Sequence, residues 1–516
     1  MKSFKNLFAL TLALVLCLSS VNAFACTAIY VGADLTEDGS TLFARSEDIS
    51  NSYNKVFYVA EAGKHKAGEV YQGCYGFTYT FTKDSYSYTA FSDDNLSGFC
   101  PDCGGEHAHT PYQAGGTNEM GLTVTATETL SGAAKAIKAI DPFNGKTGIE
   151  EAEIPTVLLS ECATAKEAVD LLLSIYDTVG AQGGSGIFIG DNTETWYIEN
   201  TTGTQYIALK LSESMAFAVP NQSAIGLIDL DDENVIASAK LIETAKAAGT
   251  YVGDEAANTI DYIASYLPDQ AANGRYASAL KHFDASFAKA QEEIVAADYA
   301  ISNVDAEGNI VPMYTNIKLD HAFSVKDIVG YYDIPGIGST GNLEIHIFQT
   351  FAEDGVTDTV EWVAMDNGCY NVFVPYYPML TTDTYAAYQL GTQSAKFVQE
   401  QPAEGLYYPT TGRVVNEAGE RVTVDGFKVL PANWADSMYW TFDALSNLCD
   451  MGNVSDEPKA DVEAKLAELQ QQAYDAYAEL QTAAASADAA KACTEISMNT
   501  AAKVHAAVVE LVNAIK

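Results

Sequence analysis

A cysteine directly follows a segment with the features of a secretion signal. Two N-terminal lysines precede an apolar run over residues 7–18, and Ala23-Phe24-Ala25 then supplies the small-x-small pattern that signal peptidase recognises. The apolar run is shorter than the roughly 20 residues that cross a bilayer. We therefore predict a signal peptide over residues 1–25, a secreted or extracytoplasmic mature protein, and Cys26 as its first residue.

A cysteine at a chain terminus carries both groups that a thiol hydrolase needs. The thiol has an ordinary pKa of about 8.5, and a free α-amine with a pKa of about 7.7 to 8.0 is a suitable base for it. Cys26 would then be the nucleophile and its own amine the base. Two alternatives stay open on the residues alone: a lipidated cysteine, although Ala23 and Phe24 match a lipoprotein signal poorly, and an ordinary buried cysteine.

A second group of chemically capable residues lies in one short stretch. Cys100-Pro-Asp-Cys103 is followed closely by His107 and His109, and two thiolates with two imidazoles can complete a tetrahedral zinc site. The alternatives are a local disulfide or free thiols beside solvated histidines. Any zinc here would be structural, and we predict no catalytic metal or other cofactor.

Composition excludes several classes of partner. The chain has 516 residues and a formal net charge of −41, which repels nucleic acid and anionic membranes. Its cysteines are spaced too irregularly for a small disulfide scaffold. The length suits one large domain with insertions or two to three average ones.

Sheet and helix patterns alternate in blocks along the chain. Residues 27–32 and 41–45 read as two strands around a Gly-containing turn, a hairpin that begins at Cys26. Apolar spacing predicts one helix from Ile154 to Tyr176 and a mainly helical region over 231–297. Further strands are expected at 122–127, 186–190, 194–199, 216–219, 343–348 and 362–365.

The C-terminal part differs in composition from the rest. Beyond Pro458 the chain is Ala-rich, with apolar residues spaced for helix faces, so residues 451–516 are expected to form a helical extension. These helices would pack on the body or on a partner chain, which leaves a homo-oligomer open. Neither is apolar all round, and we predict no membrane span there.

Several motifs together resemble one family. They are Cys26-Thr-Ala-Ile-Tyr-Val-Gly, Asp38-Gly-Ser-Thr-Leu-Phe-Ala-Arg45-Ser-Glu-Asp48, Gly116-Thr-Asn-Glu-Met-Gly-Leu122 and Val219-Pro-Asn221-Gln222. The chain resembles the dipeptidase-A-like cysteine peptidases of the N-terminal-nucleophile hydrolase superfamily, which includes penicillin V acylases and bile salt hydrolases. The resemblance implies an α+β fold, a four-layer αββα sandwich with added C-terminal helices, and a hydrolase domain over 26–450.

The resemblance also implies roles for individual residues. Cys26 would be the nucleophile, with Arg45 stabilising its thiolate and Asp48 accepting from its α-ammonium. A surface salt bridge is the alternative for this pair. Asn221 matches an oxyanion-hole asparagine, and a turn after Pro220 is its alternative.

Two further residues are candidates for substrate binding. Glu128 stands where the acylases carry a second asparagine, and its carboxylate could meet a substrate's free ammonium. Arg275 matches a late active-site arginine, although its surroundings differ from the usual ones.

The expected activity is therefore hydrolysis of dipeptides or short peptides through an acyl-thioester on Cys26. One alternative is an amidase of the same superfamily that acts on N-acyl or bile-salt-like amides. Another is a non-catalytic, lipid-anchored surface protein.

Overall fold

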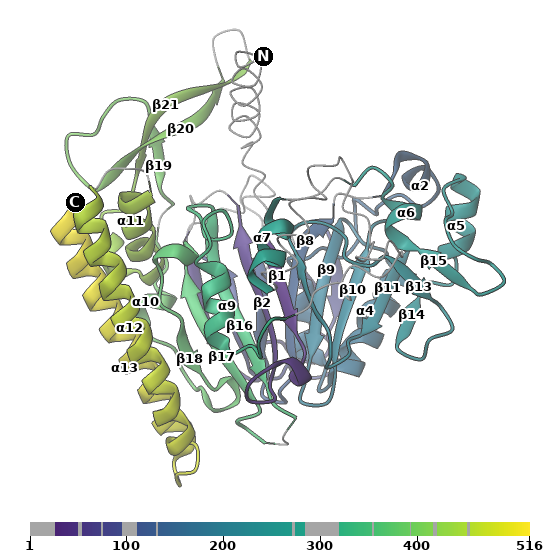
Figure 1. Ribbon diagram of the computed structural model, residues 1–516, viewed down its shortest axis with the longest axis horizontal. Coiled ribbons are helices and arrows are strands. Elements are labelled where there is room, and N and C mark those ends of the chain that lie inside the picture. Colours follow the sequence, from purple (N-terminus) through teal and green to yellow (C-terminus); the bar gives the residue numbers. More distant parts are fainter. Residues whose placement is uncertain are drawn as a thin grey trace, which may run out of the picture.

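Two antiparallel sheets lie face to face at the centre of the computed structural model (Figure 1). The structure describes residues 26–49, 54–73, 76–94, 111–130, 133–270, 274–283, 319–352, 355–392, 394–415, 420–450 and 455–516. The first sheet contains, in spatial order, β12 (Ala216–Val219), β1 (Thr27–Val31), β2 (Thr41–Asp48), β16 (Asn342–Thr350), β17 (Thr359–Met365) and β18 (Val374–Tyr376). The second contains β14 (Val235–Ala237), β11 (Tyr206–Lys210), β10 (Thr195–Asn200), β9 (Gly184–Gly190), β8 (Thr123–Leu130), β7 (Gln113–Thr117), β6 (Tyr88–Asp93) and β3 (Lys55–Ala60).

The hairpin predicted to begin at Cys26 is confirmed. β1 pairs antiparallel with β2, placing Thr27 opposite Ser46 and Ala28 opposite Arg45. On its other side β1 pairs with β12, with Ala28 opposite Val219. One end of the first sheet therefore brings together the start of β1, the end of β2 and the loop that follows β12.

Aromatic side chains fill the space between the two sheets. The Phe188 ring of β9 stacks on Phe43 of β2 with ring centroids 6.0 Å apart, and on Tyr30 of β1 at 6.3 Å. Phe91 of β6 meets Phe348 of β16 at 6.4 Å. All five rings are buried, as expected for the inner faces of a sandwich.

Helices cover the outer faces of both sheets. α3 (Ile154–Glu161) and α4 (Ala165–Thr178) share a buried apolar cluster with the second sheet. α9 (Val325–Tyr332), α11 (Met438–Asp450), α12 (Asp456–Ala483) and α13 (Ala489–Ile515) lie on the side of the first sheet (Figure 1). The chain thus forms the predicted four-layer αββα sandwich.

The C-terminal helices pack on the body of the same chain. The Trp362 ring of β17 lies between Tyr474 and Tyr477 of α12, with centroids 5.6 and 5.4 Å away. Ser497 of α13 donates to the carbonyl of Pro375 in β18 at 2.8 Å. Of the two predicted docking modes for the extension, packing on the body is the one observed. Within the described ranges, no helix has the length and apolarity required to cross a membrane.

Two expectations about local structure are wrong. The helix predicted over 154–176 is interrupted, because Cys162 is extended and the Thr164 side chain caps a new helix by accepting from the Glu167 amide. The region predicted as mainly helical over 231–297 is only partly helical in its described residues, 231–270 and 274–283. It contains β14, α5 (Leu241–Ala248), which ends at Gly249 with φ of 74°, and β15 (Thr259–Asp261), which pairs with β13 (Leu227–Asp229).

The remaining elements are short or lie at the periphery. They are η1 (Ala33–Leu35), β4 (Val70–Gln72), β5 (Thr78–Thr80), α2 (Lys135–Ile140), α6 (Tyr262–Tyr266), α7 (Gly274–Phe283), η4 (Gly368–Tyr370), η5 (Pro378–Leu380), α10 (Ala386–Gln389), β19 (Lys396–Val398), β20 (Tyr407–Val415), β21 (Arg421–Val429) and η6 (Trp434–Asp436).

Phe188→Ala tests the packing between the sheets. Because the Phe188 ring is fully buried among aromatic neighbours from both sheets, its loss should lower the free energy of unfolding by about 3–5 kcal/mol. Val415→Ala is the control, since Val415 is 66% exposed and its truncation should change stability by less than about 0.5 kcal/mol. Denaturant titration measures both. Equal midpoints for the two variants would contradict a tightly packed interior at Phe188.

Candidate active site

The thiol of Cys26 lies between the two sheets, at the start of β1. Side chains alternate along a strand, so Cys26 points to the same face as Tyr30, whose ring packs against the second sheet. Arg45 on the adjacent strand shares the face of Phe43, which also meets the second sheet. The Arg45 Nη2 donates to the Cys26 Sγ at 3.0 Å. The hairpin register therefore brings these two predicted residues into direct contact.

Arg45 is fully buried and is surrounded by partners from several elements. Its Nη2 also donates to the Tyr112 hydroxyl at 2.8 Å and to the Glu151 Oε1 at 3.3 Å, and its Nη1 lies 3.9 Å from the Glu344 Oε1. Tyr112 in turn donates to the Glu151 Oε1 at 2.5 Å. A buried guanidinium needs such counter-charges to offset its desolvation. The cluster keeps a positive charge beside the sulfur.

Burial and neighbouring charges keep the thiol protonated in the full-length chain. Desolvation is the largest cause and raises the pKa of Cys26 to about 11, with Glu151 and Asp48 adding to the increase. Arg45 and a hydrogen bond with Thr127 act in the opposite direction. With residues 1–25 attached, the nitrogen of Cys26 belongs to a peptide bond and cannot act as a base. The thiol therefore needs a further positive charge or a base to ionise at neutral pH.

Asp48 is the last residue of β2. Asn342 of β16 donates to its Oδ1 at 2.5 Å, and Arg275 of α7 donates to its Oδ2 at 3.3 Å. Desolvation raises the pKa of Asp48 to about 6, although Arg275 and Asn342 both lower it. Asp48 is thus a buried carboxylate, and the surface salt bridge considered as an alternative is not what the structure shows.

Arg275 joins the start of β1 to the loop after β12. It donates to the Cys26 carbonyl at 3.2 Å, to the Thr27 hydroxyl at 2.7 Å and to the Asn221 Oδ1 at 2.9 Å. These contacts hold the nucleophile's own backbone. They also orient the amide of Asn221, because the oxygen of that planar group faces Arg275. The predicted role of Arg275 in substrate binding stays a prediction.

Asn221 lies in a loop whose conformation is held from the second sheet. Its φ of 55° is in the left-handed region, which few residues other than glycine adopt. Glu199 of β10 accepts from the Ser223 hydroxyl and from the Ala224 amide, the latter at 2.5 Å. Desolvation raises the pKa of Glu199 to about 7. This buried carboxylate fixes the loop that carries Asn221.

The structure thus brings together five of the residues singled out from the sequence: Cys26, Arg45, Asp48, Asn221 and Arg275. The side chain of Glu128 lies outside the described residues, as do Cys100, Cys103, His107 and His109. In the part that is described, no His, Cys, Asp or Glu side chains are grouped as metal ligands.

Sequence reasoning missed Tyr112, Glu151 and Glu344 around Arg45 and the tethering contacts of Glu199. Glu199 did fall within one of the expected strands, residues 194–199. No comparable sequence signal marked Tyr112, which directly precedes β7, or Glu151, which lies in the turn before α3. Only the packing of the two sheets brings them to Arg45.

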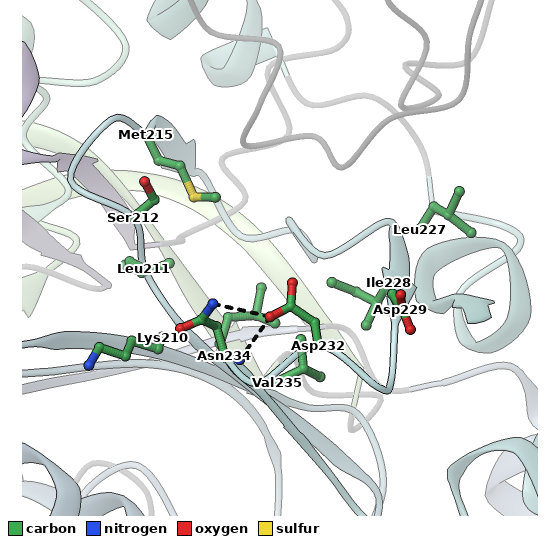
Figure 2. Close-up of a pocket in the computed structure, with 11 residues that line it drawn as sticks. Lys210, Leu211, Ser212, Met215, Leu227, Ile228, Asp229, Asp232, Asn234 and Val235 are labelled. Atoms are coloured by element: carbon green, nitrogen blue, oxygen red, sulfur yellow. Dashed lines mark hydrogen bonds between the residues drawn. The ribbon is translucent and has the colours of Figure 1, made fainter. Parts of the chain in front are cut away.

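A separate cavity of about 440 Å³ lies away from this site (Figure 2). It is lined by Met215, Leu227 and Val235 together with Asp232, whose carboxylate accepts from the side chain and backbone of Asn234. The Met215 carbonyl accepts from Gly32 just beyond the far end of β1. At about 3.3 Å per strand residue, that end is roughly 20 Å from Cys26. The cavity is therefore not part of the thiol site.

Comparison with known proteins assigns the family. The model of peptidase family C69 matches residues 25–401, so that the match begins one residue before Cys26. This chain belongs to peptidase family C69. It is therefore a peptidase, and the resemblance drawn from its motifs is confirmed.

Similar curated proteins carry dipeptidase names. A probable dipeptidase B of Streptococcus pyogenes serotype M1 is 31% identical over 387 residues, which cover 71% of this chain and 74% of that protein. A probable dipeptidase of Salmonella dublin is 32% identical over 267 residues, or 51% of this chain and 56% of the relative. The solved structure of a penicillin V acylase from Agrobacterium tumefaciens is 12% identical in sequence. The match covers 68% of this chain and 85% of the acylase chain, with a TM-score of 0.31.

Glu199→Gln tests whether the tether to the Asn221 loop matters for peptidase activity. The amide cannot accept from all the donors that converge on the carboxylate, so the loop should shift. We expect kcat on a peptide substrate to fall about 10- to 100-fold while KM changes less than about threefold.

Glu361→Gln is the matched control, because Glu361 is equally buried and accepts from Thr89 away from this loop. Both variants should lose stability, whereas only Glu199→Gln should lose kcat. In an Asn221→Ala background the Glu199 change should have little further effect on kcat. A full additional loss in that background would show that Glu199 does not act through Asn221.

Proposed function

We propose that this protein is a secreted cysteine-type dipeptidase that cleaves dipeptides or short peptides with Cys26 once residues 1–25 have been removed. The observation that carries the proposal is the contact of 3.0 Å between the buried Arg45 guanidinium and the Cys26 sulfur. A fixed cation at that distance stabilises a thiolate and so favours a nucleophile. A structural cysteine is a neutral buried thiol and does not require a guanidinium beside its sulfur.

Two further findings support the proposal. The family match begins at residue 25, which agrees with a mature domain that starts at Cys26. The curated relatives are named dipeptidases, which favours dipeptides over the N-acyl amides considered as the alternative.

Removal of residues 1–25 would supply both the base and the missing charge. The Cys26 nitrogen becomes an α-amine with an ordinary pKa of about 7.7 to 8.0, beside the thiol. As an ammonium it lowers the pKa of the thiol from its high value in the uncut chain, and as an amine it accepts the thiol proton. Asp48 is the buried carboxylate assigned to hold this ammonium.

The chemical steps follow from these groups. The thiolate of Cys26 attacks the peptide carbonyl, and the tetrahedral oxyanion is stabilised by the Asn221 amide, whose orientation Arg275 fixes. The α-ammonium protonates the leaving amine as the C–N bond breaks, leaving an acyl-thioester. The amine then takes a proton from water, whose oxygen attacks the thioester. Breakage of the C–S bond releases the acid, and the α-ammonium returns its proton to the sulfur to restore the thiol and the amine.

Cys26→Ala tests the nucleophile. With the sulfur removed, kcat/KM for a panel of unmodified dipeptides should fall roughly 10⁴-fold or more, measured by release of free amino acids. Cys369→Ala is the control, because Cys369 is another unpaired thiol and lies outside the site. Dipeptide hydrolysis that survives in Cys26→Ala would disprove a Cys26 mechanism. Preferential turnover of N-acyl amides by the wild type would favour the amidase alternative.

The maturation step predicts a change in the pH dependence of Cys26. In an uncut chain carrying Ala25→Tyr, which removes the small residue before the cleavage site, alkylation of Cys26 should rise only near pH 11. In the chain that starts at Cys26, the thiol and the amine titrate as a coupled pair. The first proton of this pair should be lost at least about one pH unit below the value for the uncut chain. Iodoacetamide labelling, followed by peptide mass spectrometry, measures both curves.

Intact mass spectrometry defines the mature terminus. Intact mass of secreted protein should correspond to a chain that begins at Cys26 without an acyl group. A lipid-modified Cys26 would exclude the catalytic role, since its sulfur would be blocked. Identical alkylation curves for the cut and uncut chains would contradict activation by cleavage.

A further inference from the structure

We propose that Glu151 binds the free α-ammonium of the substrate and thereby restricts this site to peptides with an unblocked amino end. This inference rests on the proposed function, because it concerns substrates that the Cys26 thiol attacks. The carboxylate concerned lies in the turn before α3 and reaches the thiol site between the sheets.

The position of Glu151 relative to the sulfur is set by Arg45. The same nitrogen, Arg45 Nη2, lies 3.0 Å from the Cys26 Sγ and 3.3 Å from the Glu151 Oε1. The sulfur and this carboxylate oxygen are therefore at most 6.3 Å apart, the sum of the two distances. Glu151 therefore lies close to the sulfur that a substrate carbonyl must approach in order to react.

A dipeptide carries its ammonium at a matching distance. In a reactive geometry the carbonyl carbon lies about 3–3.5 Å from the attacking atom. The α-nitrogen of the same residue is two bonds further, about 2.5 Å from that carbon. An ammonium within hydrogen-bond range of Glu151 is thus compatible with attack by Cys26, and no further residue of the substrate is needed to span the gap.

Other carboxylates near Arg45 are occupied differently. Glu344 is 1% exposed and accepts from the ring of His346 at 2.8 Å, and Glu47 pairs with the buried Lys55 at 2.7 Å. Asp48 is bound by Asn342 and Arg275 and is assigned to the protein's own amine. Glu151 is 6% exposed, against 1% for Glu344, and accepts from the same Arg45 nitrogen that contacts the sulfur. It is the carboxylate that adjoins the sulfur through Arg45 and also keeps some access to solvent.

The contacts of Glu151 suit a binding role. The Tyr112 hydroxyl and the Arg45 guanidinium both donate to its Oε1, which holds the orientation of the carboxylate. Its negative charge is also one of the causes that raise the pKa of Cys26. A substrate ammonium would offset that charge, so binding of the correct amino end would favour ionisation of the thiol. Recognition of the substrate's amino end and ionisation of the Cys26 thiol would then both depend on the contact between the ammonium and Glu151.

Glu151 and the previously predicted Glu128 are not exclusive, since an ammonium has three donors. The two differ in what the structure describes, because the side chain of Glu128 lies outside the described residues whereas the contacts of Glu151 are defined.

The test compares Glu151→Gln with Glu344→Gln on two substrates, Ala-Ala and N-acetyl-Ala-Ala. Glu344 is the matched control, because it is the other carboxylate beside Arg45 and its loss perturbs the guanidinium without removing the proposed ammonium site. We expect Glu151→Gln to lower kcat/KM for Ala-Ala about 10- to 100-fold, with little change for the acetylated peptide. Glu344→Gln should affect both substrates alike.

Glu151→Asp distinguishes loss of the ammonium site from a failure to fold. It keeps the carboxylate on a shorter side chain and should restore part of the preference for the free amino end, with thermal unfolding recorded for all variants. An equal fall for both substrates in Glu151→Gln would show that Glu151 acts only through Arg45 and would overturn the inference. A wild-type enzyme that cleaves neither peptide would instead overturn the proposed function, and this inference with it.

Discussion

The fully buried guanidinium of Arg45 is the constraint on which the rest of the site depends. A charge without solvent is costly unless other groups compensate for it, and here the compensation comes from Glu151, Tyr112 and Glu344. These residues precede α3, precede β7 and lie on β16, so the cation is stable only when both sheets are in place. The position of the thiol is therefore coupled to the folding of the whole sandwich.

A second set of contacts fixes the other side of the nucleophile. Arg275 binds the Cys26 carbonyl, Asp48 and the Asn221 side chain, and Glu199 holds the loop in which Asn221 takes its left-handed conformation. The first contacts join α7 to residues at one end of the first sheet, whereas Glu199 reaches across from the second sheet. Groups that must act at one carbonyl are thus held by elements that cannot move independently.

Much of this arrangement could be predicted from the sequence. The hairpin at Cys26 followed from a turn between two apolar runs, and the place of Arg45 beside Cys26 followed from the family resemblance, with which the antiparallel pairing agrees. The roles of Tyr112 and Glu151 could not be found in this way, because they lie 67 and 106 residues from Arg45 and no local period links them to it. The break in the helix before Thr164 was missed because the local signal was misleading. Apolar spacing continues across the break, and only a single capping residue marks it.

The electrostatics of the site explain how a buried thiol can be both inert and reactive. Desolvation and two carboxylates hold the pKa of Cys26 at about 11 in the uncut chain, so Arg45 alone does not ionise it. In the proposed function, cleavage adds one positive charge at the Cys26 nitrogen and a dipeptide adds another near Glu151. Each offsets one of the two carboxylates that oppose ionisation. The thiolate would then form only where the mature terminus and a substrate with a free amino end are both present, which confines reactivity to the bound complex.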